Sequence, residues 1–126
     1  MNVIYLWTNG NHVTYLAETL ELEGYGCGVI DVHGKLENGN GHSYYLCCDM
    51  TEDVFVNNIK LPVLRQIRTN SKDFISSQIN HVIWLKITRS TISKIRLYIC
   101  NEKGDVQSFK GRGLFCTLLL IPNKKR

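Results

Sequence analysis

The sequence is poor in the features that mark specialised classes of protein. It contains two prolines among 126 residues, which excludes collagen-like repeats and proline-rich linkers. Its longest apolar run covers residues 114–121 and is broken by Thr117, so it falls well short of the roughly 18 residues that a membrane-spanning helix needs. The first residues carry no basic leader, and we therefore expect neither a cleaved signal nor contact with a membrane.

The cysteines are too few and too irregularly spaced to form a disulfide scaffold. They number five, and no two of them form a Cys-x-x-Cys pair. We expect them to behave as small apolar side chains in a reducing, intracellular compartment. A zinc site is the alternative, although its spacing matches no familiar zinc motif. Its ligands would be Cys27, His33, His42 and Cys47 or Cys48.

Basic residues are almost absent from the first half of the chain, and acidic residues are scarce in the second half. Residues 1–59 hold one base and eight acids, whereas residues 60–126 hold fourteen bases and three acids, for a net charge of +4. The two halves can face each other within one folded body or between subunits. A basic surface for phosphate is a second interpretation, and two merely solvated faces are a third.

The remaining pattern predicts a single all-β domain. With 44% hydrophobic and 21% charged residues, a chain of this length can bury one core but not two independent ones. Short apolar or alternating segments separated by turn residues are typical of a β-sandwich or a jelly-roll-type barrel. The expected strands are residues 3–7, 27–32, 44–48, 54–64, 81–88, 92–100, 106–109 and 114–121.

Two further segments indicate helical structure. Apolar residues in the segment 12–23 share one helical stripe that ends at Gly24, although the last four residues alternate as a strand would. Residues 74–78 predict one helical turn. We expect one domain over residues 1–126, with a β core over 42–121 and a segment 1–41 whose packing the sequence leaves open. Residues 122–126 form a basic tail that binds phosphate or keeps the chain soluble.

Cations and aromatic rings alternate with core-type residues in segments 81–88 and 92–100. If these two strands pair, their solvent faces place cations beside rings. Nucleic-acid-binding sheets use this combination, because cations neutralise phosphates while rings stack on bases. Alternatively, Trp84 lies in a subunit interface or a second core. The candidate residues for binding a partner or nucleic acid are Trp84, Lys86, Arg89, Lys94, Arg96, Tyr98, Lys110 and Arg112.

No local pattern marks a catalytic or dinucleotide-binding motif. The four histidines and five cysteines occur without a nucleophile elbow. The glycines of residues 24–28 are too closely spaced for a dinucleotide-binding loop. We therefore expect no catalytic residue, no metal and no cofactor.

Read in order, residues 42–121 resemble the trimeric dUTPase family, whose fold is a jelly-roll-type β-barrel. Residues 43–46, Ser-Tyr-Tyr-Leu, stand at the place of the family's first motif, Ala-Gly-Tyr-Asp-Leu. Residues 68–71 stand near its second motif and residues 82–85 near its third. The best match is Ile-Arg-Leu-Tyr-Ile-Cys-Asn at residues 95–101, followed by a turn and by residues 109–120.

The departures from this family decide what the resemblance implies. Its third motif supplies a carboxylate that activates water and a tyrosine that holds the nucleoside, and residues 82–92 contain neither. The chain therefore resembles the catalytically silent dUTPase relatives of viruses, among them the dUTPase-related early protein of adenoviruses. This resemblance implies an intracellular, non-enzymatic interaction module of viral origin that binds host regulatory proteins and forms a trimer.

Two other functions stay open at this point. A small β-sheet nucleic-acid-binding protein would use the same candidate residues, and its affinity would fall steeply with added salt, unlike that of an apolar protein contact. An active nucleotide pyrophosphatase predicts turnover of dUTP with magnesium.

Overall fold

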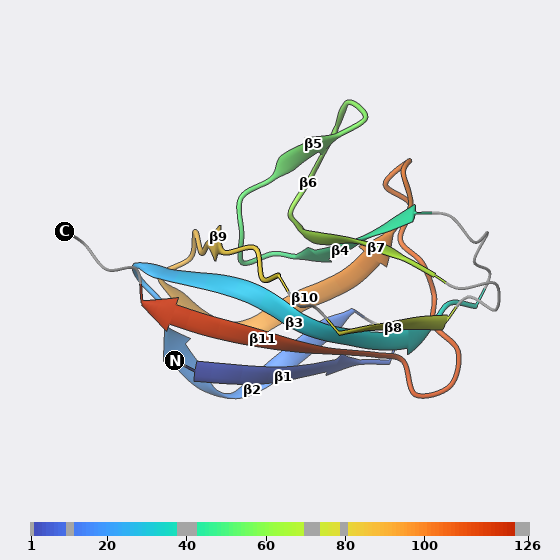
Figure 1. The fold of residues 1–126 in the computed structure, drawn as a ribbon. Coiled ribbons are helices and arrows are strands. Elements are labelled where there is room, and N and C mark those ends of the chain that lie inside the picture. The colour runs from blue at the N-terminus through green and yellow to red at the C-terminus, as the bar shows by residue number, and fades with distance from the viewer. Residues whose placement is uncertain (1, 10–11, 38–42, 70–73, 79–80, 123–126) are drawn as a thin grey trace.

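The computed structural model describes residues 2–9, 12–37, 43–69, 74–78 and 81–122. Their strands form two antiparallel sheets that pack face to face as a sandwich, with a small hairpin projecting from one side (Figure 1). These residues contain no helix, and thus none that could cross a membrane.

The first sheet has five strands and the second has four. The order of the five-stranded sheet is β1-β11-β3-β8, and β9 pairs with the same edge of β3 as β8 does. Its strands are β1 (Asn2–Thr8), β3 (Tyr25–Lys35), β8 (Phe74–Gln78), β9 (Leu85–Lys86) and β11 (Leu114–Pro122). The order of the four-stranded sheet is β2-β10-β4-β7. Its strands are β2 (Val13–Glu21), β4 (Ser43–Cys48), β7 (Val63–Arg68) and β10 (Thr91–Cys100).

The main core lies between the two sheets and follows the alternation of the strands. In β10, Ile95, Leu97 and Ile99 are fully buried, as the alternation of segment 92–100 predicts. Leu118 of β11 and Leu6 of β1 enter the same core from the five-stranded sheet. All five cysteines are buried and unpaired, in agreement with the expectation that they act as small apolar residues.

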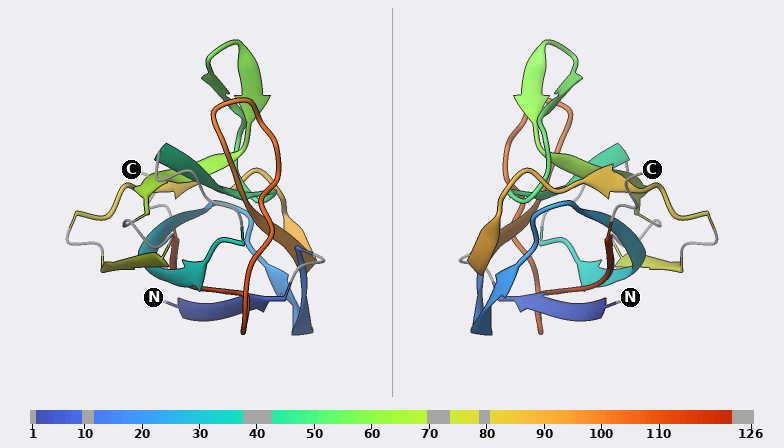
Figure 2. Two further views of the ribbon diagram at one scale, coloured as in Figure 1. Left: turned by 90° about the vertical axis from the view of Figure 1, so that its right-hand side faces the viewer. Right: turned by 90° about the vertical axis from the view of Figure 1, so that its left-hand side faces the viewer.

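A second, smaller core covers the outer side of the four-stranded sheet. The hairpin of β5 (Val54–Val56) and β6 (Ile59–Leu61) folds over this side, and it turns at two asparagines with positive φ. Figure 2 shows the hairpin and the connection between β10 and β11 rising on the same side of the molecule. The cluster contains Cys47, Val56, Leu61, Tyr98 and Cys100. Tyr98 is only 7% exposed, so the prediction that it faces solvent is wrong, because the hairpin covers it.

Both expected helices are wrong. Residues 12–23 mostly form β2, which pairs with β10 through a bulge between Ile92 and Lys94. Leu16 and Leu20, four positions apart, share one face of a strand as well as one stripe of a helix, and both pack against the main core. Residues 74–78 form β8, an edge strand in which Ile75 is buried.

Other expected features also differ from the structure. Segment 81–88 forms the two-residue strand β9 and one isolated bridge, between Thr51 and Ile87. Segment 106–109 makes two isolated bridges, Cys100 with Val106 and Leu36 with Phe109. A closed barrel is wrong as well, because β1, β2, β7 and β8 stay edge strands of open sheets within the described residues. The packing of segment 1–41 was left open by the sequence. Its strands β1 and β3 belong to the five-stranded sheet, and its strand β2 belongs to the four-stranded sheet.

His12, just before β2, makes the stability of the fold depend on pH. Its ring packs edge-on against Phe109 at 5.9 Å between centroids, and its Nδ1 atom is buried without a hydrogen-bond partner among the described residues. Burial, and to a lesser degree the charge of Arg96, lowers the pKa of His12 below its ordinary value.

Protonation of His12 therefore favours the unfolded chain. The free energy of unfolding should be highest above about pH 6.5 and should fall as the pH drops below that value, because the unfolded chain binds the proton more readily. We expect His12→Asn, which tolerates the positive φ of 63° at this position, to reduce this loss. Urea titrations between about pH 7 and about pH 5 measure it. Equal pH slopes in the two proteins would contradict the assignment.

Candidate functional site

A row of exposed rings crosses the outer face of the five-stranded sheet. Trp7 of β1 lies opposite Phe115 of β11, and His33 of β3 lies opposite Phe115 on its other side. The rings of Trp7 and Phe115 are 6.2 Å apart between centroids, and both residues are more than 40% exposed. Their side chains point outward because the neighbouring residues of both strands face the core.

A cation and a further ring stand beside this row. Lys35 of β3 pairs with Phe74 of β8, and the Lys35 Nζ atom lies 4.8 Å from the centre of the Phe74 ring. This distance allows a cation–π interaction, which holds the ammonium group near the ring. We call Trp7, His33, Lys35, Phe74 and Phe115 the aromatic-basic face.

The loop of residues 110–113 forms a wall at one end of this face. The backbone N–H of Lys110 donates to the carbonyl of Lys35 at 2.9 Å, and the indole N–H of Trp7 donates to the carbonyl of Arg112. Gly113 has a φ of +86°, and a Cβ atom there would collide with the carbonyl oxygen of Thr8. Only glycine fits this close approach between the loop and the end of β1.

Loop and face enclose an open recess of about 470 Å³. We call it the basic recess. It is lined by His33, Gly34, Lys35, Phe74, Ile75, Lys110, Gly111, Arg112, Gly113 and Phe115. Three of these residues are basic and none carries a carboxylate. Lys35, Lys110 and Arg112 form no ion pair with the described residues. The recess therefore suits an anion that also carries an apolar or aromatic part.

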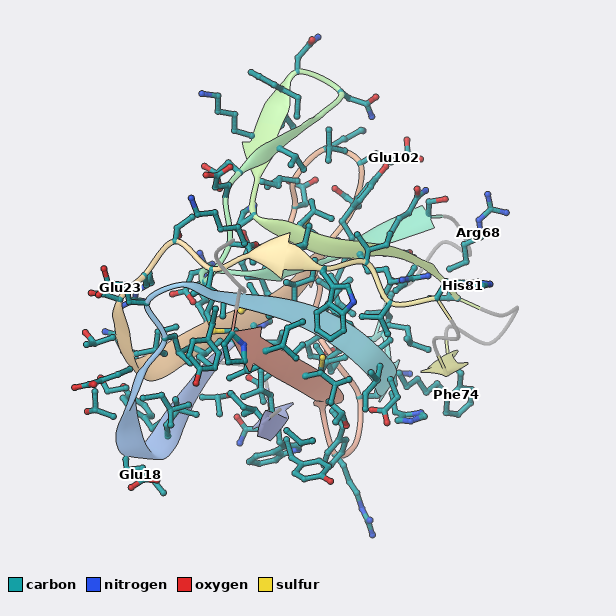
Figure 3. The ribbon with its side chains drawn as sticks, turned by 60° about the vertical axis from the view of Figure 1, so that its left-hand side comes forward. Glu18, Glu23, Arg68, Phe74, His81 and Glu102 are labelled. Carbon is teal, nitrogen blue, oxygen red and sulfur yellow. The ribbon has the colours of Figure 1, made fainter. Side chains whose placement is uncertain are left out.

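The rest of the outer face is less basic. Asp31 of β3 stands opposite Thr117 near the middle of the sheet. Tyr5 is 80% exposed on β1, and Val3 is also exposed there. In Figure 3, Glu18 and Glu23 lie at the end of the molecule opposite to Phe74 and Arg68. An anion is thus attracted to the end of the face that holds the basic recess.

The predicted site residues fall into three places. Lys110 and Arg112 line the basic recess. Trp84 lies over Gly28 on the outer side of the five-stranded sheet, near Lys86 in β9. The others lie around the four-stranded sheet: Lys94 and Arg96 are exposed on β10, Tyr98 is buried, and Arg89 forms an ion pair with Asp49 at 3.4 Å.

The single surface expected from pairing segment 81–88 with segment 92–100 is therefore wrong. Strand β9 pairs with β3, whereas β10 pairs with β2 and β4. Within β10 itself, Arg96 stacks over Tyr98, with 4.5 Å between the guanidinium carbon and the ring centre. Sequence reasoning missed Trp7, Lys35, Phe74 and Phe115. For Trp7, the sequence did contain a signal, because Tyr5 and Trp7 alternate with apolar residues.

The residues of the possible zinc site do not come together. Cys27 and Cys48 lie in the main core, Cys47 lies in the second core, and His33 lies on the outer face. His42 is outside the described residues. Burial raises the pKa of the Cys27 thiol to about 11, so this thiol stays protonated and binds metals poorly near neutral pH. No group of three metal-binding side chains occurs in the part of the chain that the structure describes.

Neither the family models nor the curated protein sequences compared with the chain give a match. The structure shows an all-β sandwich, and the resemblance to dUTPases stays a prediction.

Proposed function

We propose that this protein binds single-stranded nucleic acid through the aromatic-basic face. The observation that carries this proposal is the placement of Lys35, Lys110 and Arg112 beside exposed rings in one open recess. Cations supply affinity for the phosphate backbone, and the rings of Phe74 and Phe115 supply stacking surfaces for bases.

The open shape of the face favours binding without strong sequence preference. Stacking on aromatic side chains contributes about 1–3 kcal/mol per base and tolerates any base. Trp7 and Phe115 stand on neighbouring strands, and their exposed rings lie side by side, so a base can cover either ring from the solvent side. Double-stranded nucleic acid has its bases stacked on one another and cannot use these rings.

Salt dependence and matched variants test this proposal. The probe is a fluorescein-labelled single strand of about 12 nucleotides, titrated by anisotropy. With three cations on the phosphates, we expect the affinity to fall roughly 10- to 20-fold between about 50 and 200 mM salt. Phe115→Ala should lower the affinity at least about fivefold, and Lys110→Ala should weaken both the affinity and its salt dependence.

Lys94→Ala is the matched control, because it removes the same charge from β10 of the other sheet. We expect it to leave the affinity nearly unchanged. The proposal is wrong if no strand binds, or if Lys94→Ala and Lys110→Ala weaken binding equally.

A protein partner is the second proposal, and a different observation favours it. Val3 and Tyr5 are exposed apolar residues on β1, which is an edge strand of the five-stranded sheet. Edge strands with such residues accept a strand from another chain. On this proposal, the surface binds the host regulatory protein that the dUTPase resemblance implies. The protein then has a non-enzymatic, intracellular role of viral origin. An affinity that does not change with salt, and that falls on substitution of Tyr5 but not of Lys110, would support this proposal over nucleic-acid binding.

A further inference from the structure

We propose that the basic recess holds the terminal phosphomonoester of a nucleic-acid strand while the terminal base stacks on Phe74 or Phe115. This inference rests on the proposed function, because it says which part of a single strand occupies one end of the aromatic-basic face.

The position of the recess favours a strand end over the middle of a strand. The loop of residues 110–113 is fastened over the end of the face by the Lys110 hydrogen bond to Lys35 and the Trp7 hydrogen bond to Arg112. A strand that runs along the face towards the recess meets this loop as a wall. The simplest occupant of a recess closed on that side is the terminal nucleotide.

The charge of the recess matches a phosphomonoester better than an internal phosphodiester. Lys35, Lys110 and Arg112 give the lining three positive charges, and none of the described lining residues carries a carboxylate. A monoester carries about −1.5 to −2 charges at pH 7, whereas a diester carries one. Asp31 near the middle of the face disfavours the same dianion there.

The size and walls of the recess fit a nucleotide rather than an isolated phosphate ion. A volume of about 470 Å³ lies in the range of small-molecule sites, and a phosphate ion would leave most of it empty. The exposed rings of Phe74 and Phe115 supply an apolar wall against which a base can lie. Arg112 can form two parallel hydrogen bonds to the phosphate oxygens, and Lys35 is already positioned beside the Phe74 ring.

Three strands of identical sequence test the inference. One carries a 5′-phosphate, one a 3′-phosphate, and one hydroxyl groups at both ends. We expect one phosphorylated strand to bind at least about fivefold more tightly than the hydroxyl strand, because its terminal phosphate adds about 1.5 to 2 negative charges opposite the cations of the recess. Uridine 5′-monophosphate should compete with that strand, and uridine should not.

Two variants assign the preference to the recess. Arg112→Gln should remove the preference for the phosphorylated end while the hydroxyl strand still binds, whereas Arg96→Gln on the other sheet should retain it. If all three strands bind equally, the terminal-phosphate inference is overturned and the proposed function stands. If no strand binds, the proposed function fails. If uridine 5′-monophosphate binds and no strand does, the occupant of the recess is a free nucleotide, and the inference that it holds a strand end is overturned.

Discussion

Gly113→Ala is expected to lower the free energy of unfolding by at least about 3 kcal/mol. Gly113 has a φ of +86°, a conformation that costs an alanine roughly 1–2 kcal/mol. The added Cβ atom would also collide with the carbonyl oxygen of Thr8 and lie 2.9 Å from the Cα atom of Asn9. Both neighbours are backbone atoms, so the end of β1 or the start of β11 must shift.

Gly111→Ala is the matched control for this variant. Gly111 also has a positive φ, of +67°, but a Cβ atom there meets no atom within 4 Å. Only the conformational strain remains, so we expect a loss of about 1–2 kcal/mol. Urea titrations followed by tryptophan fluorescence measure both losses, and equal values would mean that the close approach to Thr8 contributes nothing.

The same pair of variants connects the fold to the site. A displaced loop moves Lys110 and Arg112 away from Lys35, so Gly113→Ala should weaken nucleic-acid binding even at temperatures where the variant is folded. Gly111→Ala keeps the hydrogen bond from Lys110 to Lys35 and should bind almost as well as the natural protein.

Local alternation was the part of the fold that the sequence could predict. Ile95, Leu97 and Ile99 lie in the core because inside and outside alternate along one strand, and this needs no knowledge of the neighbouring strands. The helix expected around Leu16 and Leu20 failed for the opposite reason. A spacing of four residues fits one face of a strand as well as one stripe of a helix, and the pairing of β2 with β10, more than seventy residues later in the chain, selects the strand.

The candidate site could be predicted in kind but not in place. A sheet face that combines cations and rings was expected, and Lys110 and Arg112 were among the named residues. Their partners Lys35 and Phe74 come from other segments, and only the pairing of β3 with β8 and β11 brings them together. Strand order is set by contacts distant in sequence, which no local pattern encodes.

The charge asymmetry of the chain has two outcomes in the fold. The ion pair between Asp49 and Arg89 joins the acidic first half to the basic second half. In the basic recess, by contrast, Lys110 and Arg112 of the second half join Lys35, the single base of the first 59 residues. No acid occurs among the described residues that line the recess, so we expect its three cations to repel one another and a bound anion to stabilise the protein.

Leu97→Ala and Tyr98→Ala, at adjacent positions of β10, should affect two different cores. Leu97 is fully buried between the sheets, and its truncation leaves a cavity that both sheets line. We expect a loss of about 3–5 kcal/mol in the free energy of unfolding. Amide protons of both sheets should then exchange faster together, because the sandwich has one main core.

Tyr98→Ala should instead release the β5–β6 hairpin from the four-stranded sheet. Tyr98 packs in the second core with Val56 and Leu61 of the hairpin, so its loss should speed amide exchange in β5 and β6 far more than in β11. Part of the cost is then local, and the global loss should be smaller than that of Leu97→Ala. Hydrogen exchange with mass spectrometry resolves the two segments. Uniform acceleration in Tyr98→Ala would mean that the hairpin and the sandwich unfold as one unit, and that the second core is an extension of the first.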